Sequence, residues 1–434
     1  MRRIVLATTG TLGDLHPFVS LALALRARGL TPVIAAMEDY RGVVEAEGLA
    51  FHAVRPGHRE MAASGLDEAA VARAVTGDLR AGFDIMLPHL AATLGDLRRV
   101  MVGADLVICG TLSVVARIVA EAAGIPTVTI ALQPMGFLSV AEPPTMREMP
   151  FLPVLRKTCG AGVVRMLYAL GSAQGRPGMR PVARLRRELD LAPVRDELVD
   201  GPRRSERIFA LYPPAFAALP VDAPRQARSA GFAYYDGRDG ATRTLDPALA
   251  AFLDTGPPPL VFTLGSFVTH APGNFYTASA RAARRLGRRA ILLVGQHALA
   301  DCAALAGDDI AVAGYAPHSL LFPRAAAVIQ HGGIGTTAQA LRAGVPQLVC
   351  PFFGDQFDNG ARLKRLGVAR VVALRRYSEK RACAALRLLL DTPEPTERAH
   401  ALAPQMTRDD GPAMIGDWVT EHLAARQADE RLVA

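Results

Sequence analysis

The stretch Gln330-His331-Gly332-Gly333-Ile334-Gly335-Thr336-Thr337 follows an apolar segment, 326–329, and precedes a sequence with helical periodicity. The pattern predicts a buried strand, a glycine turn and a helix that begins near Gly333. The first turn of a helix carries N–H groups without intrahelical partners and a partial positive charge, so it binds phosphate well. Glycines let the backbone approach the anion closely, and side-chain donors add hydrogen bonds. The predicted phosphate ligands are His331, Gly333, Gly335, Thr336 and Thr337.

A second strand-to-helix turn follows the apolar segment 347–350 and contains Pro351-Phe352-Phe353-Gly354-Asp355-Gln356. The carboxylate of Asp355 and the amide of Gln356 offer the acceptors and donors that sugar hydroxyls need. A glycine turn alone is also typical of an ordinary strand–helix connection. The two turns in this order, the first suited to phosphate and the second to a polyol, indicate instead that the chain binds a nucleotide sugar.

Residues 312–369, which include both turns, resemble the signature segment of the family 1 nucleotide-sugar-dependent glycosyltransferases, which include plant natural-product, antibiotic and sterol glycosyltransferases. The resemblance extends to Thr9–Pro17 and to the junction Gly231-Phe-Ala-Tyr-Tyr-Asp-Gly237. Within the family, this junction, Tyr315-Ala-Pro317 and Asp355-Gln-Phe-Asp-Asn359 resemble the rhamnosyltransferases of rhamnolipid synthesis. The resemblance implies the α/β GT-B fold, in which two doubly wound Rossmann-like domains with parallel sheets face a central cleft. It also implies transfer with inversion and without a metal.

The resemblance assigns roles to single residues. His331 matches a position that contacts the diphosphate, and Tyr315 matches an aromatic position that stacks on the nucleotide base. Gln339 stands where plant members carry a glutamate that holds the ribose, so the nucleotide stays open between thymidine and uridine diphosphate. Gly265 and Ser266 close the first strand-end turn of the same half and would add donors to the site.

The acceptor hydroxyl needs a general base, and Asp14 is the first candidate because it ends the turn Gly10-Thr-Leu-Gly13 after the first strand. By resemblance, antibiotic glycosyltransferases carry aspartate at this place. His16 is a rival, since histidine has an unperturbed pKa nearer to neutrality. The sequence has no Asp-x-Asp at a strand end and no cluster of His, Cys and carboxylate residues with metal spacing. We therefore expect no metal and no cofactor besides the nucleotide-sugar co-substrate.

Apolar segments alternate with helical segments in both halves of the 434-residue chain, which predicts two domains with parallel sheets. We expect an acceptor-binding domain at 1–212, a linker at 213–240, a donor-binding domain at 241–410 and a terminal helix at 411–434 that, by resemblance, crosses back to the first domain. The expected strands are 3–8, 31–36, 50–54, 105–109, 126–132, 207–212, 259–264, 290–294, 310–313, 326–330, 347–350 and 369–373.

Composition narrows the location and the partners. The longest apolar stretch, 106–140, is interrupted by Arg117 and Glu121, so no membrane span and by default a cytoplasmic location are expected. The net charge of +8 suits anions, and peripheral attachment to an anionic lipid surface stays open. The basic runs lack interleaved aromatic residues, so nucleic-acid binding is not expected. The five cysteines have neither disulfide nor metal spacing.

Several functions stay open at this point. The resemblance to the rhamnosyltransferases implies transfer of L-rhamnose from dTDP-L-rhamnose to a small hydrophobic or lipid acceptor, which is our first prediction. The alternative is a UDP-glucose-type transfer to a natural product or sterol. A sugar-nucleotide 2-epimerase shares the two-domain architecture, although the long insertion 133–201 argues against it. A nicotinamide-dependent oxidoreductase would need a G-x-G-x-x-G turn, which Gly10–Gly13 lacks. A non-catalytic partner that binds nucleotide sugar is the last alternative.

Overall fold

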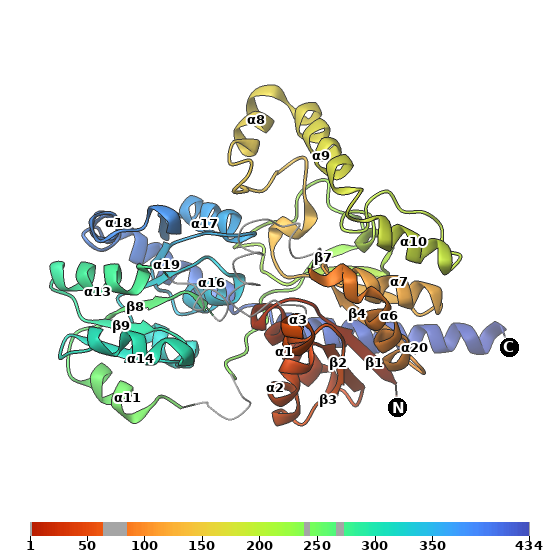
Figure 1. Cartoon of the computed structure of the whole chain (residues 1–434), viewed down its shortest axis with the longest axis horizontal. Helices are drawn as coiled ribbons and strands as arrows, with labels where there is room; N and C mark the ends of the chain where they lie inside the picture. Colours follow the sequence, from red (N-terminus) through yellow and green to blue (C-terminus); the bar gives the residue numbers. More distant parts are fainter. Residues whose placement is uncertain (1, 64–84, 238–243, 266–272, 434) are drawn as a thin grey trace.

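The computed structural model describes residues 2–63, 85–237, 244–265 and 273–433, with side chains up to residue 429. Two parallel sheets, one from each half of the chain, lie side by side (Figure 1). The first sheet contains β1 (Arg3–Ala7), β2 (Thr31–Ala36), β3 (Ala50–Ala53), β4 (Leu106–Gly110), β5 (Thr127–Ala131), β6 (Arg207–Ala210) and β7 (Ala227–Ser229). The second contains β8 (Leu260–Thr263), β9 (Ala290–Leu293), β10 (Ile310–Ala313), β11 (Ala327–Gln330), β12 (Gln347–Val349) and β13 (Ala369–Val371). Every strand expected from the sequence is present.

Helices pack on both faces of each sheet because the strand side chains alternate between two layers. In β1, Ile4 and Leu6 join one core with α1 and α20, whereas Val5 and Ala7 join another with α6 and α7. The helices of the first half are α1 (Leu12–Arg26), α2 (Arg41–Ala46), α3 (His58–Ala63), α6 (Leu90–Val100), α7 (Val114–Ala122), α8 (Leu152–Cys159), α9 (Ala161–Gly175) and α10 (Arg180–Glu188). Those of the second are α11 (Pro247–Asp254), α13 (Phe275–Arg285), α14 (Leu299–Cys302), α15 (His318–Leu321), α16 (Ile334–Arg342), α17 (Gln356–Arg365), α18 (Glu379–Leu390), α19 (Glu394–Met406) and α20 (Gly411–Val433).

Both sheets are doubly wound. The strand order is β3-β2-β1-β4-β5-β6-β7 in the first and β10-β9-β8-β11-β12-β13 in the second, so the order reverses beside β1 and beside β8. Sheets of this kind bind ligands outside the carboxyl ends of the strands at the point of reversal. The turns that follow β1, β8 and β11 stand at these points, and they carry the predicted base and phosphate ligands.

A strand that was not predicted, β7, lies within the expected linker 213–240. It pairs in parallel with β6, so the sheet of the first domain continues past residue 212. The strand escaped prediction because it is three residues long and reads Ala-Arg-Ser, without the apolar run that marks a buried strand. Around it, Phe216 and Phe232 pack in one cluster with Leu341 and Leu363 of the second domain. This cluster holds the two domains against each other.

The last helix, α20, crosses back to the first domain (Figure 1). Its side chains Ile415, Val419 and Leu423 enter the core formed with α1, and Asp417 forms an ion pair with Arg28 of α1 at 2.7 Å.

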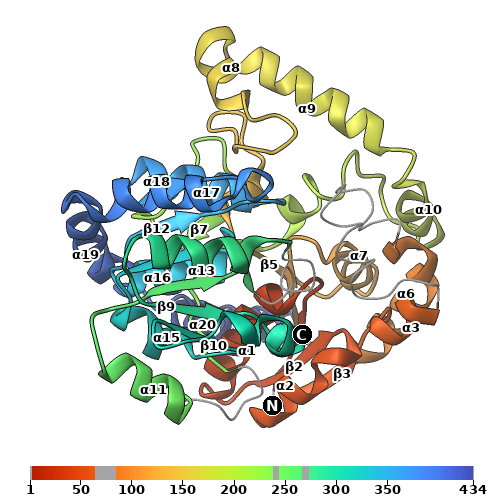
Figure 2. The same ribbon diagram turned by 60° about the vertical axis from the view of Figure 1, so that its left-hand side comes forward.

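The insertion between β5 and β6 contains a helical hairpin, α8 and α9, separated by Gly160 with a φ of +80°. The hairpin stands out from the body of the molecule in both views (Figures 1 and 2). Within the described part of the chain, the search for a helix long and apolar enough to cross a bilayer finds none.

Candidate active site

The turn between β11 and α16 is organised by Gln330, whose side chain is buried. The side-chain nitrogen Nε2 of Gln330 donates to Thr337 Oγ1 (3.1 Å) and to Gln347 Oε1 (3.0 Å). Its side-chain oxygen Oε1 accepts a hydrogen bond from the N–H of Gly332. Gly332 has a φ of +100°, and a Cβ at this residue would lie 2.8 Å from the carbonyl oxygen of Gln356. Only glycine fits that conformation and that space. These contacts determine where α16 begins.

The N-terminus of α16 is open to a ligand. Gly333 occupies the N-cap position, and no side chain among the described residues caps the helix there. Gly335 is exposed, and a Cβ added to it would meet no described atom within 4 Å. The backbone N–H groups of the first turn are therefore available to an anion.

The two threonines of the motif do not face such an anion equally. Thr336 keeps 8% of its surface, but Thr337 is completely buried and its hydroxyl accepts the hydrogen bond from Gln330. Contact between the Thr337 hydroxyl and phosphate therefore stays a prediction. In the structure this hydroxyl helps to hold the turn in place.

His331 occupies space that two glycines leave. A Cβ at Gly265, which has a φ of +70°, would lie 2.5 Å from the ring atom Cε1, and a Cβ at Gly333 would lie 2.4 Å from Nε2. Burial lowers the pKa of His331 to about 4, so the ring is neutral near pH 7. Its Nδ1 is buried and has no hydrogen-bond partner among the described residues. Ser266, predicted beside Gly265, lies outside the described residues.

Asp355 and Gln356 begin α17 at the neighbouring strand end. Asp355 is partly exposed, and burial of its carboxyl group raises its pKa to about 7. Gln356 is buried, and its side-chain oxygen Oε1 accepts hydrogen bonds from the N–H groups of Phe352 (3.1 Å) and Phe353 (3.3 Å). Gln356 therefore shapes the loop, which leaves only its amide nitrogen for a sugar hydroxyl.

Asn359 links the two turns. Its amide nitrogen donates both to Asp355 Oδ2 (2.7 Å) and to the carbonyl oxygen of Gly332 in the phosphate turn (2.9 Å). In the sequence Asn359 follows Asp355 by one helical turn, and this spacing marks the two as neighbours on a helix.

Tyr315 and Gln339 both hold Asp236, a residue of the interdomain junction. Tyr315 Oη donates to the main-chain carbonyl of Asp236, and Gln339 Nε2 donates to Asp236 Oδ1 at 3.1 Å. The backbone N–H of Ser319 also donates to Oδ1, at 3.1 Å. Sequence reasoning missed Asp236 as a site residue, although it lies within the junction 231–237 on which the family resemblance rests.

Asp14 lies in the first turn of α1 and forms a reciprocal cap. The N–H of Gly13 donates to Thr11 Oγ1 (3.2 Å), and the N–H of Thr11 donates to Asp14 Oδ2 (2.8 Å). Gly10 has a φ of +135°, and a Cβ there would lie 2.2 Å from Asp14 Oδ2, so glycine makes room for the carboxylate. Burial raises the pKa of Asp14 to about 6, against the hydrogen bonds from Thr11, which lower it. The carboxyl group is therefore mostly ionised near pH 7, and its pKa is close enough to that pH for the group to accept a proton.

His16 points to the interdomain junction. Its ring centroid lies 5.0 Å from that of Tyr235, and its Nε2 is buried without a hydrogen-bond partner among the described residues. The pKa of His16 is lowered to about 4, mainly by burial and in part by the nearby His318, while the charge of Asp236 acts in the opposite direction. A group with this pKa is a weak base near pH 7, so the environment favours Asp14 over His16 as the base.

The carboxylates of Asp14 and Asp355, one from each domain, interact electrostatically. The charge of Asp14 contributes to the raised pKa of Asp355, after burial, which is the larger cause. Such coupling requires proximity, because solvent and salt screen distant charges. The domain contact itself is held by Arg362 of α17, which pairs with Asp358 (2.8 Å) and with Glu142 of the first domain (2.9 Å).

No three His, Cys, Asp or Glu side chains within the described ranges gather as metal ligands would. Independence of a metal stays a prediction.

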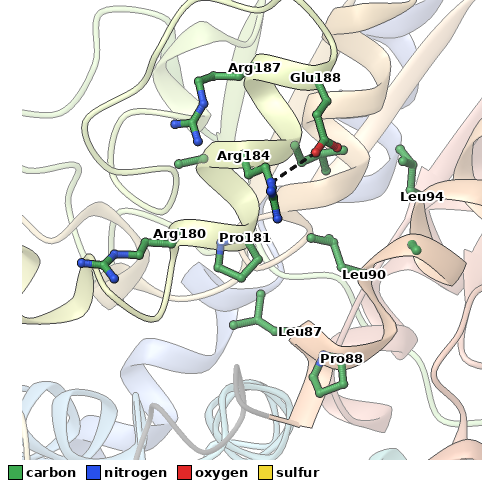
Figure 3. A pocket seen from close by; sticks show the side chains of 12 residues that line it. Leu87, Pro88, Leu90, Leu94, Arg180, Pro181, Arg184, Arg187 and Glu188 are labelled. Atoms are coloured by element: carbon green, nitrogen blue, oxygen red, sulfur yellow. Dashed lines mark ion pairs between the residues drawn. The ribbon is translucent and has the colours of Figure 1, made fainter.

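A groove of about 780 Å³ lies in the first domain between α10 and the segment that leads into α6 (Figure 3). Apolar side chains, including Leu87, Leu90 and Leu185, line it, and arginines stand along its rim. Arg184 pairs with Glu188 at 3.5 Å, whereas Arg180 and Arg187 have no ion-pair partner among the described residues. Because α6 leads into β4 and crosses antiparallel to it, the first turn of α6 lies at the carboxyl edge of the sheet, the edge that also carries Asp14.

Family models match both halves of the chain. The model of the glycosyltransferase family 28 N-terminal domain matches residues 4–141. The model of the erythromycin biosynthesis protein CIII-like C-terminal domain matches residues 281–421.

Individual relatives match almost the whole chain. O-mycaminosyltylonolide 6-deoxyallosyltransferase of Streptomyces fradiae is 31% identical over 98% of this chain and 99% of its own. Two solved structures share the fold. The spinosyn rhamnosyltransferase SpnG complexed with thymidine diphosphate has a TM-score of 0.68 at 19% identity, and it covers 97% of this chain and 100% of its own. The glycosyltransferase VinC in complex with dTDP has a TM-score of 0.69 at 21% identity, and the match covers 98% of this chain and 100% of VinC.

Proposed function

The chain belongs to the family 1 glycosyltransferases of the antibiotic-biosynthesis type, and on this premise we propose that it transfers L-rhamnose from dTDP-L-rhamnose, with inversion and without a metal, to a hydroxyl group of a small or lipid-like acceptor. As a member of this family the protein is a transferase, so the epimerase, the oxidoreductase and the non-catalytic partner are set aside. One observation carries the proposed mechanism. Burial raises the pKa of Asp14 to about 6, and the charge of Asp14 contributes to the raised pKa of Asp355 in the opposite domain.

In this proposal the second domain holds the donor. The first-turn N–H groups of α16 and the neutral ring of His331 donate hydrogen bonds to the diphosphate, where negative charge grows as the sugar leaves. Asp355 accepts hydrogen bonds from sugar hydroxyls, and the amide nitrogen of Gln356 adds a donor. Fixed donors of this kind need no reorganisation during the reaction.

The first domain supplies the base. Asp14 takes the proton from the acceptor hydroxyl as that oxygen attacks the anomeric carbon from the side opposite the diphosphate. The bond from the anomeric carbon to the phosphate oxygen breaks as the new one forms, which inverts the configuration. Positive charge that builds on the sugar is stabilised by the nearby carboxylates.

A deoxysugar donor on thymidine diphosphate is supported by the relatives. SpnG is a rhamnosyltransferase and was solved with thymidine diphosphate, VinC was solved with dTDP, and the Streptomyces fradiae relative is a 6-deoxyallosyltransferase. An apolar acceptor is supported by the leucine-lined groove at the carboxyl edge of the first sheet.

Thermal-shift measurements with dTDP, UDP, GDP and their sugars test the donor. We expect stabilisation by dTDP and dTDP-L-rhamnose, and a shift only with UDP-glucose would replace the rhamnosyl assignment by a glucosyl one. Turnover of dTDP-L-rhamnose with apolar hydroxyl acceptors, in excess EDTA, tests the reaction. Loss of turnover that magnesium restores would contradict the metal-independent mechanism.

A further inference from the structure

Asp236 comes from the junction between the domains, yet three donors of the second domain hold it. Tyr315 binds its main-chain carbonyl, and Gln339 and the N–H of Ser319 both bind Oδ1 of its side chain. Such convergence keeps one carboxylate in one orientation. The hydrogen bonds of the side chain all go to a single oxygen.

The other carboxylate oxygen, Oδ2, has no hydrogen-bond partner among the described residues, and Asp236 is partly exposed. Gln339 keeps its amide nitrogen on Asp236 although this leaves its own Oε1 buried and unpaired in the described structure. A purely structural anchor at this place would need only one oxygen, and a neutral side chain would serve. A carboxylate group with one oxygen hydrogen-bonded and the other without a described partner is instead suited to accept a hydrogen bond from a ligand.

The position of Asp236 along α16 indicates which part of a ligand it meets. Gln339 lies five residues after Ile334, the first residue of the helix, which corresponds to about 7.5 Å along the axis. When a diphosphate occupies the N-terminus of α16, this distance from the phosphate to the carboxylate held by Gln339 is about the length of one pentose. The ring of Tyr315, which is held on the same residue, offers a flat surface next to it.

We propose that Asp236 is a donor-binding residue, whose Oδ2 accepts a hydrogen bond from the pentose 3′-hydroxyl of the nucleotide. This inference rests on the proposed function, because it requires a nucleoside diphosphate at α16. The 3′-hydroxyl is common to thymidine and uridine diphosphates, so the contact serves either nucleotide.

The residue next to Asp236 contacts the first domain. Tyr235 Oη donates to Glu47 of the first domain at 3.0 Å, and its ring lies against His16. A nucleotide bound to Asp236 is thus one residue away from a contact with the first domain. Asp236 therefore adjoins a contact between the junction and the first domain.

Asp236→Asn is the matched variant, because the oxygen of asparagine can keep both hydrogen bonds at Oδ1 while an amide nitrogen replaces Oδ2. Calorimetric titration with dTDP, UDP and the 3′-deoxy form of each measures the contact. In the wild type, removal of the 3′-hydroxyl should weaken binding roughly 10- to 100-fold, as expected for a hydrogen bond to a charged group. In Asp236→Asn, the parent nucleotide should lose a similar factor, and its 3′-deoxy form should bind nearly as well as the parent.

Asp254→Asn is the control, since Asp254 is an exposed residue of α11 whose ion-pair partner is Arg324. It should bind every nucleotide as the wild type does. Undiminished binding of dTDP or UDP by Asp236→Asn overturns the inference alone. Equal wild-type affinity for a nucleotide and its 3′-deoxy form overturns it as well, even if the variant fails to fold. Absence of binding of both dTDP and UDP to the wild type overturns the proposed function together with the inference.

Discussion

Replacing Asp14 by asparagine is expected to remove most of the transfer activity and, in the same protein, to increase the stability of the fold. The activity falls because asparagine cannot accept the proton of the acceptor hydroxyl, and loss of a general base typically costs about 10²–10⁴-fold. The stability rises because burial of the ionised carboxylate is unfavourable, as its pKa of about 6 records. Asparagine can still accept the N–H of Thr11 through its carbonyl oxygen, so the helix cap survives.

The size of the gain follows from the pKa. Each pKa unit corresponds to about 1.4 kcal/mol, so a rise from 3.8 to about 6 amounts to at most about 3 kcal/mol. Asp14 is partly exposed, and a negative charge in the first turn of a helix is itself worth about 0.3–1 kcal/mol. We therefore expect Asp14→Asn to be more stable than the wild type by about 1–2 kcal/mol at pH 8.

The gain in stability of Asp14→Asn over the wild type should increase with pH. Above pH 4 the unfolded chain has lost the proton of Asp14 while the folded protein keeps it up to about pH 6, so wild-type stability falls as the pH rises through this window. Asparagine does not titrate. The advantage of the variant should therefore be near zero below pH 3, about half developed at pH 5 and complete above pH 7.

Urea unfolding at pH 5 and pH 8, with initial rates measured on the same preparations, tests both parts. Asp254→Asn, which removes a carboxylate from the surface, should change neither the rate nor the pH dependence of stability. Two outcomes would refute the reasoning: a variant that keeps more than a tenth of the wild-type rate, or one that is less stable than the wild type at pH 8.

Three further predictions concern the same site. The kcat/KM of the wild type should fall below about pH 6 as Asp14 gains its proton; an acid limb near pH 4 would point to His16 as the base. Gly333→Ala should weaken dTDP binding by at least about tenfold in titration calorimetry, because its Cβ would lie 2.4 Å from His331 Nε2; unchanged affinity would mean that the ring does not contact the nucleotide. Gly335→Ala should raise thermal stability by up to about 1 kcal/mol through helix propensity yet weaken nucleotide binding; tighter binding would show that the diphosphate does not approach this turn.

Strands buried on both faces were predictable because each is a run of apolar residues, such as Ile4 to Ala7 in β1 or Ala327 to Ile329 in β11. β7 was not predictable, because its pairing with β6 stabilises it and its three residues show no run of apolar side chains. The division of 152–175 into two helices depends on Gly160, whose left-handed conformation interrupts an otherwise helical stretch.

The chemistry of the site divides in the same way. The glycines around His331 and the cap formed by Thr11 and Asp14 involve residues within a few positions of one another, so spacing along the chain reveals them. Burial depends on the complete packing, which is why Thr337 could be placed in the motif but not recognised as inaccessible. The same holds for the pKa of Asp14, because desolvation by the surrounding structure raises it.

By itself the sequence determined two doubly wound domains, a glycine turn at His331 that precedes a helix and a carboxylate at Asp14 after the first strand. Only the tertiary structure decided which groups meet across the domain boundary. Asp14 and Asp355 become electrostatic neighbours there, and Asp236 reaches Gln339 across 103 residues of chain. The physical reason is that apolar periodicity and helix caps join residues a few positions apart, whereas tertiary hydrogen bonds, charge coupling and desolvation depend on distance in space.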